Sequence, residues 1–302
     1  MAVPPQRPIS TLPECPRCKT GLRRTVEGPV ARKSRPRGIL PAMDLERLQM
    51  EFEGPVARIW LNRPEVRNAF DGLMVTELRT ALFDLRTVDS VRVIVIGGRG
   101  STFCAGADLE WMKAMAAFSR EDNLREAQAM ADLFFTVYES PKPVIARVHG
   151  AALGGGAGLV AACDIPVAAL GTQFGFTEVR LGIIPAVISP YVVSKIGESA
   201  ARELFLTGER FEAVKACEIG LVRQAVPEED LDQVVEARIE QILQSAPRAV
   251  AEAKALIREV AWRRVEDVQR YTVERIADIR ISPEAQEGMK AFLEKRKPYW
   301  IV

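Results

Sequence analysis

Residues 141–165, PKPVIARVHGAALGGGAGLVAACDI, decide the fold. Their apolar, partly β-branched start at 144–148 predicts a buried strand, and the small residues that follow predict a turn that opens a helix ending at Cys163. Glycines at such a turn let a ligand approach the backbone closely, while the first N–H groups of the helix point outward as donors. The turn at 149–158 is therefore a candidate ligand site, although close packing of helix on strand explains the glycines equally well.

The same strand and helix pattern recurs on both sides of this stretch. In chain order, the predicted strands and helices are 56–61, 73–85, 91–96, 120–138 and 165–168. Strands that alternate with helices predict an α/β core. A second turn of small residues, STFCAGADL at 101–109, follows the strand at 91–96. Side by side, the two turns would supply paired backbone amides to one developing oxyanion.

The composition excludes several classes of protein. The chain has 302 residues, 48% of them apolar, which is enough to bury a large core in one or two domains. Its net charge of +1 gives no overall field for nucleic acid or a membrane, and no apolar run reaches the ~20 residues that span a bilayer. We therefore expect a soluble protein with neither partner. The single histidine, His149, excludes any site with two imidazole ligands, and Ser-His-Asp chemistry would have to use that residue.

The first 42 residues differ in composition from the rest. They hold eight of the 19 prolines, and nine Lys or Arg against two acidic residues, so we expect a disordered basic extension. Three origins stay open: a tail, a start codon upstream of Met43, and a transit peptide, which the prolines disfavour. Cys15 and Cys18 form one CPRC pair, whereas a zinc ribbon needs two such pairs, so we predict no metal. The scattered cysteines favour a reducing compartment, hence the cytoplasm, or the mitochondrial matrix if the extension is a transit peptide.

The chain changes character again after Gly220. Residues 221–225 predict a last strand, and about four helical segments follow up to Trp300. We therefore divide the chain into an extension at 1–42, an α/β core at 43–240 and a helical C-terminal subdomain at 241–302. This subdomain packs on its own core or on a neighbouring copy.

The turn at 149–158 does not fit the common nucleotide-binding motifs. A dinucleotide site would need an acidic residue about 20 positions further on, where Asp164 comes too early and Glu178 lies beyond another strand. A P-loop would need Gly-Lys-Ser/Thr after the turn, which neither turn has. Phosphate transfer is therefore disfavoured.

Several blocks, in order, resemble the crotonase family, also called the enoyl-CoA hydratase/isomerase family. They are NRPEVRNAF at 62–70, FCAGADL at 103–109, the stretch at 141–165, FGFTEVRLGIIP at 174–185, LTGERFEAVKACEIGLV at 206–222 and AFLEKRKPYW at 291–300. The resemblance implies an α/β fold, a spiral of ββα units with a C-terminal helical trimerisation subdomain. It also implies acyl-CoA substrates, a homotrimer or dimer of trimers, and no cofactor, since coenzyme A is part of the substrate.

By this resemblance, the backbone amides of Ala107 and Gly155 form an oxyanion hole for the thioester carbonyl. Negative charge collects on that oxygen when the α-carbon gains carbanion character, and losing one such donor costs ~3 kcal/mol or more of barrier. The resemblance also implies substrate contacts around the CoA adenine, along the pantetheine arm and from the C-terminus, often of a neighbouring copy. These positions are Ala105, Asp108, Leu109, Asn68, Ala69, Phe292 and Lys295.

Family hydratases use two glutamates, of which only the second has a counterpart in this chain. Glu178 matches that second acid, whereas Gly158 stands where the first would be. Glu178 is therefore expected to act alone as acid and base, unless it is a structural acid in a strand-to-helix turn. Because the usual pair that holds water is missing, an enoyl-CoA isomerase stays an alternative, as does another kind of enoyl-CoA hydratase.

Three blocks further resemble bacterial methylglutaconyl-CoA hydratases: GADLEWM at 106–112, GGGAGLVAACDI at 154–165 and GIIPAVISPYVV at 182–193. This resemblance implies the interconversion of 3-methylglutaconyl-CoA and 3-hydroxy-3-methylglutaryl-CoA in leucine and isovalerate metabolism. We expect Gly158 to leave room for the distal carboxylate of that substrate and to avoid like-charge repulsion.

Other residues leave alternatives open. Arg147 and Arg180 are candidate cations for the distal carboxylate, and each is equally explained as a solvated arginine. Trp111 and Met112 are expected to begin a helix that walls the acyl pocket, or to be ordinary core. His149 is expected to be a satisfied or solvent-touching histidine. A noncatalytic RNA-binding protein that uses the basic extension is the alternative of another class.

Overall fold

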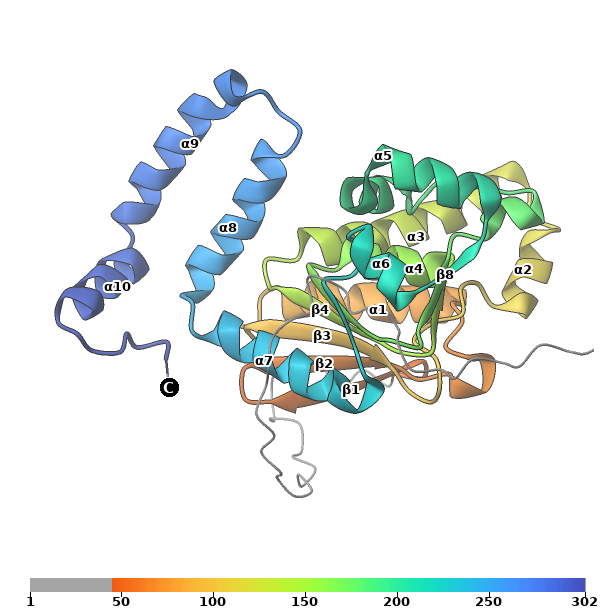
Figure 1. Ribbon diagram of the computed structural model, residues 1–302, viewed down its shortest axis with the longest axis horizontal. Helices are drawn as coiled ribbons and strands as arrows, with labels where there is room; N and C mark the ends of the chain where they lie inside the picture. The colour runs from red at the N-terminus through yellow and green to blue at the C-terminus, as the bar shows by residue number, and fades with distance from the viewer. Residues whose placement is uncertain (1–44, 302) are drawn as a thin grey trace, which may run out of the picture.

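A computed structural model of the chain describes residues 45–301. The predicted extension at 1–42, with Cys15 and Cys18, lies outside these residues. The described chain consists of a sheet-based core and a set of helices that extends from it (Figure 1). Within residues 45–301, no helix combines the length and the apolar character needed to cross a bilayer.

A six-stranded sheet forms the base of the core. Its strands lie in the order β1 (Leu48–Glu53), β2 (Val56–Leu61), β3 (Val93–Gly98), β4 (Val144–Val148), β6 (Ile165–Ala169) and β9 (Gln224–Val226). β1 and β2 are antiparallel, and the other neighbours are parallel. Both faces of the central strands are apolar, since Ile94 and Ile96 belong to one core cluster and Val93 and Val95 to another. This is the pattern of a parallel sheet that is covered on both sides.

A smaller sheet includes a short strand from the second glycine-rich turn. It consists of β5 (Ala151–Leu153), β7 (Gln173–Gly175) and β8 (Arg210–Glu212). β5 runs parallel to β7, and β7 antiparallel to β8. Two strands followed by a helix recur along the chain, first as β1, β2 and α1 (Gly72–Leu85), later as β4, β5 and α4 (Gly155–Ala162). The predicted ββα architecture is confirmed.

Helices cover both faces of the large sheet. The main cluster lies between the sheet and four helices: α1, α3 (Arg120–Glu139), α4 and α5 (Ser189–Thr207). On the opposite face, α7 (Leu231–Leu243) packs Leu231 and Val235 against Val95 and Ile145. The remaining core elements are α2 (Leu109–Met115), α6 (Ala213–Glu218), and the short 3-10 helices η1 (Pro64–Val66), η2 (Glu178–Leu181) and η3 (Glu228–Asp230).

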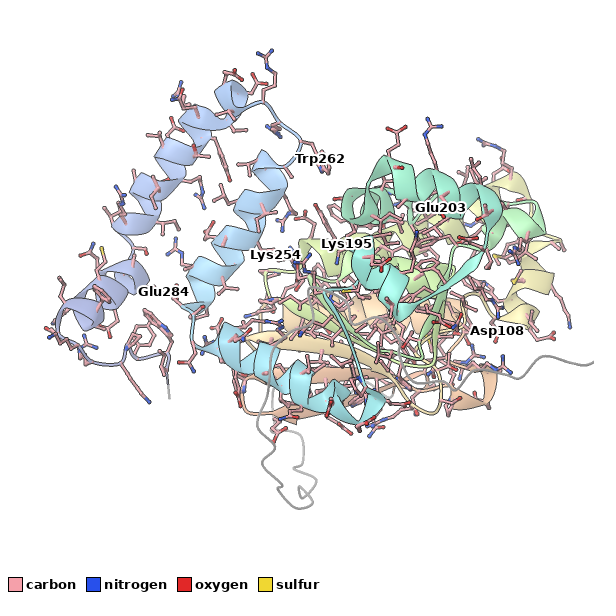
Figure 2. All side chains as sticks on the ribbon, in the orientation of Figure 1. Asp108, Lys195, Glu203, Lys254, Trp262 and Glu284 are labelled. Atoms are coloured by element: carbon pink, nitrogen blue, oxygen red, sulfur yellow. The ribbon has the colours of Figure 1, made fainter. Side chains whose placement is uncertain are left out.

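The last three helices form an arm beside the core: α8 (Pro247–Val260), α9 (Val265–Arg280) and α10 (Pro283–Leu293) (Figure 1). The ion pairs Lys254–Asp164, at 2.7 Å, and Arg258–Glu139, at 2.9 Å, join α8 to the core. Figure 2 shows Lys254 where the arm meets the core. Large apolar side chains on the arm are exposed: Ile257, Trp262, Val265, Val273, Ile281, Phe292 and Leu293. Such a surface favours contact with another molecule.

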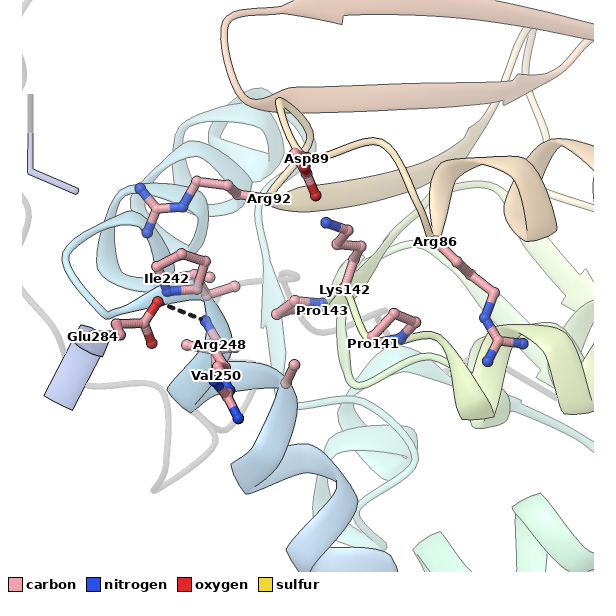
Figure 3. Close-up of a pocket in the computed structure, with 12 residues that line it drawn as sticks. Arg86, Asp89, Arg92, Pro141, Lys142, Pro143, Ile242, Arg248, Val250 and Glu284 are labelled. Atoms are coloured by element: carbon pink, nitrogen blue, oxygen red, sulfur yellow. Dashed lines mark hydrogen bonds between the residues drawn. The ribbon is translucent and has the colours of Figure 1, made fainter. Parts of the chain in front are cut away.

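The arm is also tied to the core beside a cavity of about 360 Å³ (Figure 3). Arg92, just before β3, donates hydrogen bonds to the carbonyls of Trp300, at 2.9 Å, and Leu243, at 3.1 Å. From α10, the Glu284 carboxylate accepts from the first amides of α8, at 2.8 Å from Ala249. These contacts fasten both ends of the arm to each other and to the sheet.

The elements that the sequence predicts occur in the predicted order, but two strands are shifted. The strand predicted at 91–96 is observed at Val93–Gly98. The strand predicted at 221–225 is observed at Gln224–Val226. Leu221 and Val222 are fully buried in the preceding turn, where the Val222 amide bonds to the Ala216 carbonyl instead of to β6. The proposed division between 240 and 241 falls inside α7, whose Ile239 still packs against the sheet. The division into core and C-terminal subdomain otherwise stays a prediction.

Candidate active site

The two predicted turns pair with each other beyond the carboxyl ends of β3 and β4. The Cys104 amide donates to the Ala151 carbonyl, and the Leu153 amide to the Cys104 carbonyl, both at 3.0 Å. On its other side, the first turn pairs with Phe70, which bonds to Gly106 and Asp108. Crevices at the carboxyl ends of parallel strands are the usual ligand sites of α/β proteins.

This pairing determines the surroundings of the Ala107 and Gly155 amides. The bridge to Phe70 uses the carbonyl of Gly106 and the amide of Asp108, and it leaves the groups of Ala107 unused. Gly155 is the first residue of α4, so its amide has no intrahelical acceptor. Within residues 45–301, neither amide donates a hydrogen bond. Free amides on two adjacent turns are suited to bind an oxyanion.

Glu178 lies against the second turn, as the first residue of η2. Its Oε1 atom is 3.3 Å from the position that a Cβ would take on Gly154, whose φ of +51° is left-handed. Its Oε2 atom is buried and has no hydrogen-bond partner within the described residues. Burial raises the pKa of the Glu178 carboxyl from its ordinary value of 4.5. A buried acid without a partner is a poor structural anchor and a good proton donor or acceptor.

Apolar side chains border the amide of Gly155. A Cβ on Gly155 would lie 3.3 Å from Cδ2 of Phe70 and 3.5 Å from Cε of Met130. Trp111 on α2 is partly buried against the same core cluster. The sequence alone does not single out Met130, because its spacing on α3 does not differ from that of ordinary core residues. Phe70, by contrast, ends one of the family blocks.

The expectation that Gly158 leaves room for a substrate carboxylate is wrong for this structure. A Cβ on Gly158 would lie only 2.1 Å from Cγ2 and 2.7 Å from Cβ of Ile188. Ile188, just before α5, is 4% exposed and fills the space beside the glycine. Because Ile188 branches at its Cβ, it cannot move aside as a long flexible side chain would. The position of the first family acid is therefore apolar and closed.

The Asn68 side chain is also corrected, from a substrate contact to a support of the first turn. Asn68 is fully buried, and its Oδ1 accepts from the Arg63 amide at 2.8 Å. Its Nδ2 donates to the carbonyls of Arg99, at 2.8 Å, and Thr102, at 2.7 Å. All its polar atoms thus have partners within the protein, so the side chain has no free group for a hydrogen bond to substrate.

The Asp108 side chain has a similar supporting role, whereas the predicted substrate contact of Ala69 stays a prediction. The Asp108 carboxylate caps α2 through the Glu110 and Trp111 amides and accepts from Arg63 at 2.9 Å. Burial by itself raises the pKa of Asp108, but these donors outweigh burial and lower it. Arg63 also donates to the Ala69 carbonyl at 2.8 Å. The side chain after Ala107 therefore fixes the turn rather than facing the substrate.

Ala105 and Leu109 lie on the open side of the same turn. Ala105 is partly exposed and Leu109 is 73% exposed. Their predicted contact with the substrate has room in the structure and stays a prediction.

The two candidate arginines for a distal carboxylate form contacts with other groups of the protein. Successive side chains of β4 point to opposite faces of the sheet, and Arg147 lies on the face that α7 covers. There it forms an ion pair with Asp232. Arg180 follows Glu178, but its Nε donates to the Thr207 carbonyl at 3.4 Å, beside the end of α5. Both arginines thus have partners within the protein, and their role toward a distal carboxylate stays a prediction.

Phe292 and Lys295 lie far from the turns of their own chain. Phe292 is 82% exposed at the end of α10, and Lys295 is exposed just beyond it. Figure 2 shows Asp108, in the first turn, at the opposite end of the molecule from Glu284 of α10. Substrate contact by these residues therefore requires the site of another copy.

Comparison with known proteins agrees with this arrangement. The family model for enoyl-CoA hydratase/isomerase matches residues 51–301. The crystal structure of an enoyl-CoA hydratase from Shewanella pealeana superposes with a TM-score of 0.83 and 39% identity, over 85% of this chain and 97% of that one. An enoyl-CoA hydratase/isomerase from Marinobacter aquaeolei gives a TM-score of 0.81 and 37% identity, over 85% of this chain and all of that one.

A crotonyl-CoA hydratase from Syntrophomonas wolfei is 32% identical over 86% of this chain and 99% of its own length. The fold and the paired turns define an enzyme of the hydro-lyase type that acts on acyl-CoA thioesters. The chain belongs to the enoyl-CoA hydratase/isomerase, or crotonase, family.

Proposed function

We propose that this enzyme reversibly adds water to a 2-enoyl-CoA thioester, with Glu178 as its acid and base. The observation that carries the proposal is the buried, unpartnered Oε2 atom of Glu178 beside the turn that presents the Gly155 amide. A neutral carboxyl gives a proton in one direction and its carboxylate takes one back in the other, and its raised pKa suits both.

The amides of Ala107 and Gly155 hold the thioester oxygen in this proposal. When water is lost, the α-carbon gives up a proton and negative charge moves onto the thioester oxygen, while the hydroxyl leaves the β-carbon as water. Two fixed N–H donors stabilise that charge more in the transition state than in the substrate, which is what lowers the barrier. The reaction needs no cofactor, since coenzyme A belongs to the substrate.

At a finer level, we propose 3-methylglutaconyl-CoA as the substrate and 3-hydroxy-3-methylglutaryl-CoA as the product of hydration. The support is the resemblance of residues 106–112, 154–165 and 182–193 to hydratases of that substrate. Ile188 changes the reasoning, because it fills the space beside Gly158 and the distal carboxylate must lie elsewhere. Enoyl-CoA isomerisation is the second candidate. Of the two positions that match the family glutamates, the one at Gly158 is closed, so Glu178 is the one acid of the pair.

An ultraviolet assay of the conjugated thioester separates these reactions. Purified protein is given 3-methylglutaconyl-CoA, crotonyl-CoA and a 3-enoyl-CoA, beside E178Q and, as a matched control, the exposed-surface variant E229Q. We expect absorbance to fall fastest with 3-methylglutaconyl-CoA, E178Q to be nearly inactive and E229Q to match wild type. Rising absorbance with the 3-enoyl-CoA alone would instead identify an isomerase, and activity retained in E178Q would overturn the role of that acid.

The assembly and location are proposed at the same level. The exposed apolar face of the arm and the distance of Phe292 from its own site support a homotrimer or a dimer of trimers. Cys104 and Cys163 are free and buried, which agrees with the reducing cytoplasm that we propose.

A further inference from the structure

His149, the single histidine of the chain, is the first residue of the second turn, and its side chain reaches Gly100, just before the first turn. It is 6% exposed, its Nε2 is 2.8 Å from the Gly100 carbonyl, and its Nδ1 is 3.3 Å from an Arg147 guanidinium nitrogen. A carbonyl only accepts and a guanidinium only donates. These partners therefore assign the proton to Nε2 and leave Nδ1 as an acceptor, which is the neutral imidazole.

The bond to Gly100 closes one end of the contact between the turns. The His149 carbonyl accepts from the Phe103 amide at 2.9 Å, and the Cys104 and Ala151 pairing follows directly. Gly150, at φ +64°, approaches so closely that a Cβ there would lie 1.9 Å from the Ser101 carbonyl oxygen. Since no side chain fits at residue 150, the imidazole of the preceding residue is the side chain that spans this junction.

The imidazole is itself held from the other side of the sheet. Arg147, which donates to Nδ1, forms an ion pair with Asp232 of α7, so that α7, Arg147, His149 and the Gly100 turn make one continuous chain of contacts. Three residues beyond Cys104 lies Ala107, and two residues beyond Leu153 lies Gly155. A shift between the turns at Gly100 therefore moves one of the two amides relative to the other.

We propose that His149 is a positioning residue for the oxyanion hole: its Nε2–H bond to Gly100 sets the separation of the Ala107 and Gly155 amides. This inference rests on the proposed function of those amides. Because they act mainly on the transition state, a change in their separation affects kcat more than KM. A displacement of about 1 Å can cost up to about a hundredfold in rate.

Two substitutions distinguish the contacts of the imidazole. The amide nitrogen of glutamine stands about as far from the backbone as Nε2, so H149Q keeps the bond to Gly100. Asparagine reaches only as far as Nδ1, so H149N keeps the contact with Arg147 and loses Gly100. We expect kcat close to wild type in H149Q and about ten- to a hundredfold lower in H149N, with KM changed little. T172V is the stability control, since Thr172 is fully buried and bonds to the Val148 carbonyl beside this junction without reaching the Gly100 turn.

Spectra of the same variants test the proposal without turnover. Nitrogen-15 NMR of the single histidine is expected to show a protonated Nε2 and a bare Nδ1 at neutral pH. Dimethylaminocinnamoyl-CoA, whose absorbance moves to longer wavelength when its carbonyl is polarised, reports on the amides directly. We expect the full shift in wild type, H149Q and T172V, and a reduced shift in H149N with binding retained.

The outcomes separate this inference from the proposed function. A wild-type protein that shifts the absorbance of the probe but hydrates none of the enoyl thioesters would overturn the proposed reaction. The role of His149 would then still be tested by the absorbance shifts of the variants. Equal kcat and equal shifts in H149N and H149Q, or a proton on Nδ1, would overturn the positioning role alone. Absence of any shift in wild type would remove the oxyanion hole and the role of His149 together.

Discussion

Glu178 combines burial with the absence of a partner for one of its oxygens. Its pKa is raised in the folded protein, so between the unfolded and folded values the folded state binds more protons, and stability falls as pH rises through that window. We expect E178Q to lower kcat by about 10²- to 10⁴-fold. It should also raise the melting temperature above wild type at neutral pH, and this gain should shrink as the pH falls below the window.

Thermal unfolding of both proteins from acid to neutral pH, beside the hydration assay, checks this prediction. A melting temperature lower in E178Q than in wild type across the whole range would mean that the carboxylate has a stabilising partner and is a structural acid.

The contact between Gly158 and Ile188 predicts strong coupling between the two positions. G158E alone overfills the site and should cost about 1–3 kcal/mol of folding free energy, while I188A alone leaves a cavity at a cost of about 2–5 kcal/mol. In G158E/I188A the new side chain occupies the freed space. We expect the double variant to be more stable than the sum of the single changes allows.

The double variant also tests the chemistry of the missing acid. G158A/I188A is its matched control, since it differs from G158E/I188A by the carboxyl alone. We expect G158E/I188A to hydrate crotonyl-CoA faster than that control and 3-methylglutaconyl-CoA no faster. Denaturant titration and the ultraviolet assay give both answers, and equal rates in the two double variants on both substrates would contradict the prediction.

Single positions also show what the sequence predicts about the site. Ala107, Gly155 and Glu178 follow from the family blocks, and the structure places them around the paired turns. The contact of Ile188 with Gly158 does not follow from them, because nothing in the order of residues shows that a side chain thirty positions away fills the space beside Gly158. The bond of His149 to Gly100 is hidden for the same reason, since it joins residues 49 positions apart.

Among the elements, α5 contains a break at Gly197, where φ is +76° and ψ is 165°. Among residues 45–301, no atom lies within 4 Å of a Cβ placed there, so the backbone conformation, and not the space, requires glycine. We expect G197A to cost about 1–3 kcal/mol, because a positive φ combined with an extended ψ is a conformation that essentially only glycine adopts.

Gly72 gives a matched comparison at the start of α1. It is equally open, but its φ is not left-handed, so we expect G72A to be stabilising by about 0.4–1 kcal/mol through the unfolded chain. Urea unfolding of both variants measures the difference, and equal effects of the two substitutions would exclude strain as the cause.

Element boundaries are predicted well where the apolar pattern is long. The helix expected at 120–138 is observed at Arg120–Glu139, and the strand expected at 144–148 is observed at Val144–Val148. The last strand is shifted, because Leu221 and Val222 are apolar for burial in a turn and not for pairing. Apolar character reports burial, and only the partner strand decides where pairing begins.

At the scale of the whole molecule, the exposed apolar residues of the arm predict self-association. Leu293 is 78% exposed, so L293E should leave the fold of one chain intact while it places a charge in the contact. We expect wild type to elute with a mass that is three or six times 33.4 kDa, and L293E to shift toward 33.4 kDa.

R270A is the control, since the Arg270 side chain is 91% exposed on α9 and forms an ion pair with Glu274 of the same helix. Light scattering after size exclusion measures all three proteins. A monomeric wild type, or an L293E mass equal to that of wild type, would contradict a contact through α10.

The whole-molecule picture is the part that sequence predicts least directly. The helical C-terminal segments follow from their spacing, but their projection as an arm depends on ties such as Arg92 to Trp300, which joins residues 208 positions apart. Such ties follow from packing, which no local pattern encodes.

The closed space between Gly158 and Ile188 also bears on how this chain can change by single substitutions. Either exchange made first passes through an overfilled or a hollow intermediate, so each step alone is penalised. The present pair and a pair with an acid at residue 158 are therefore separated by a barrier in sequence space.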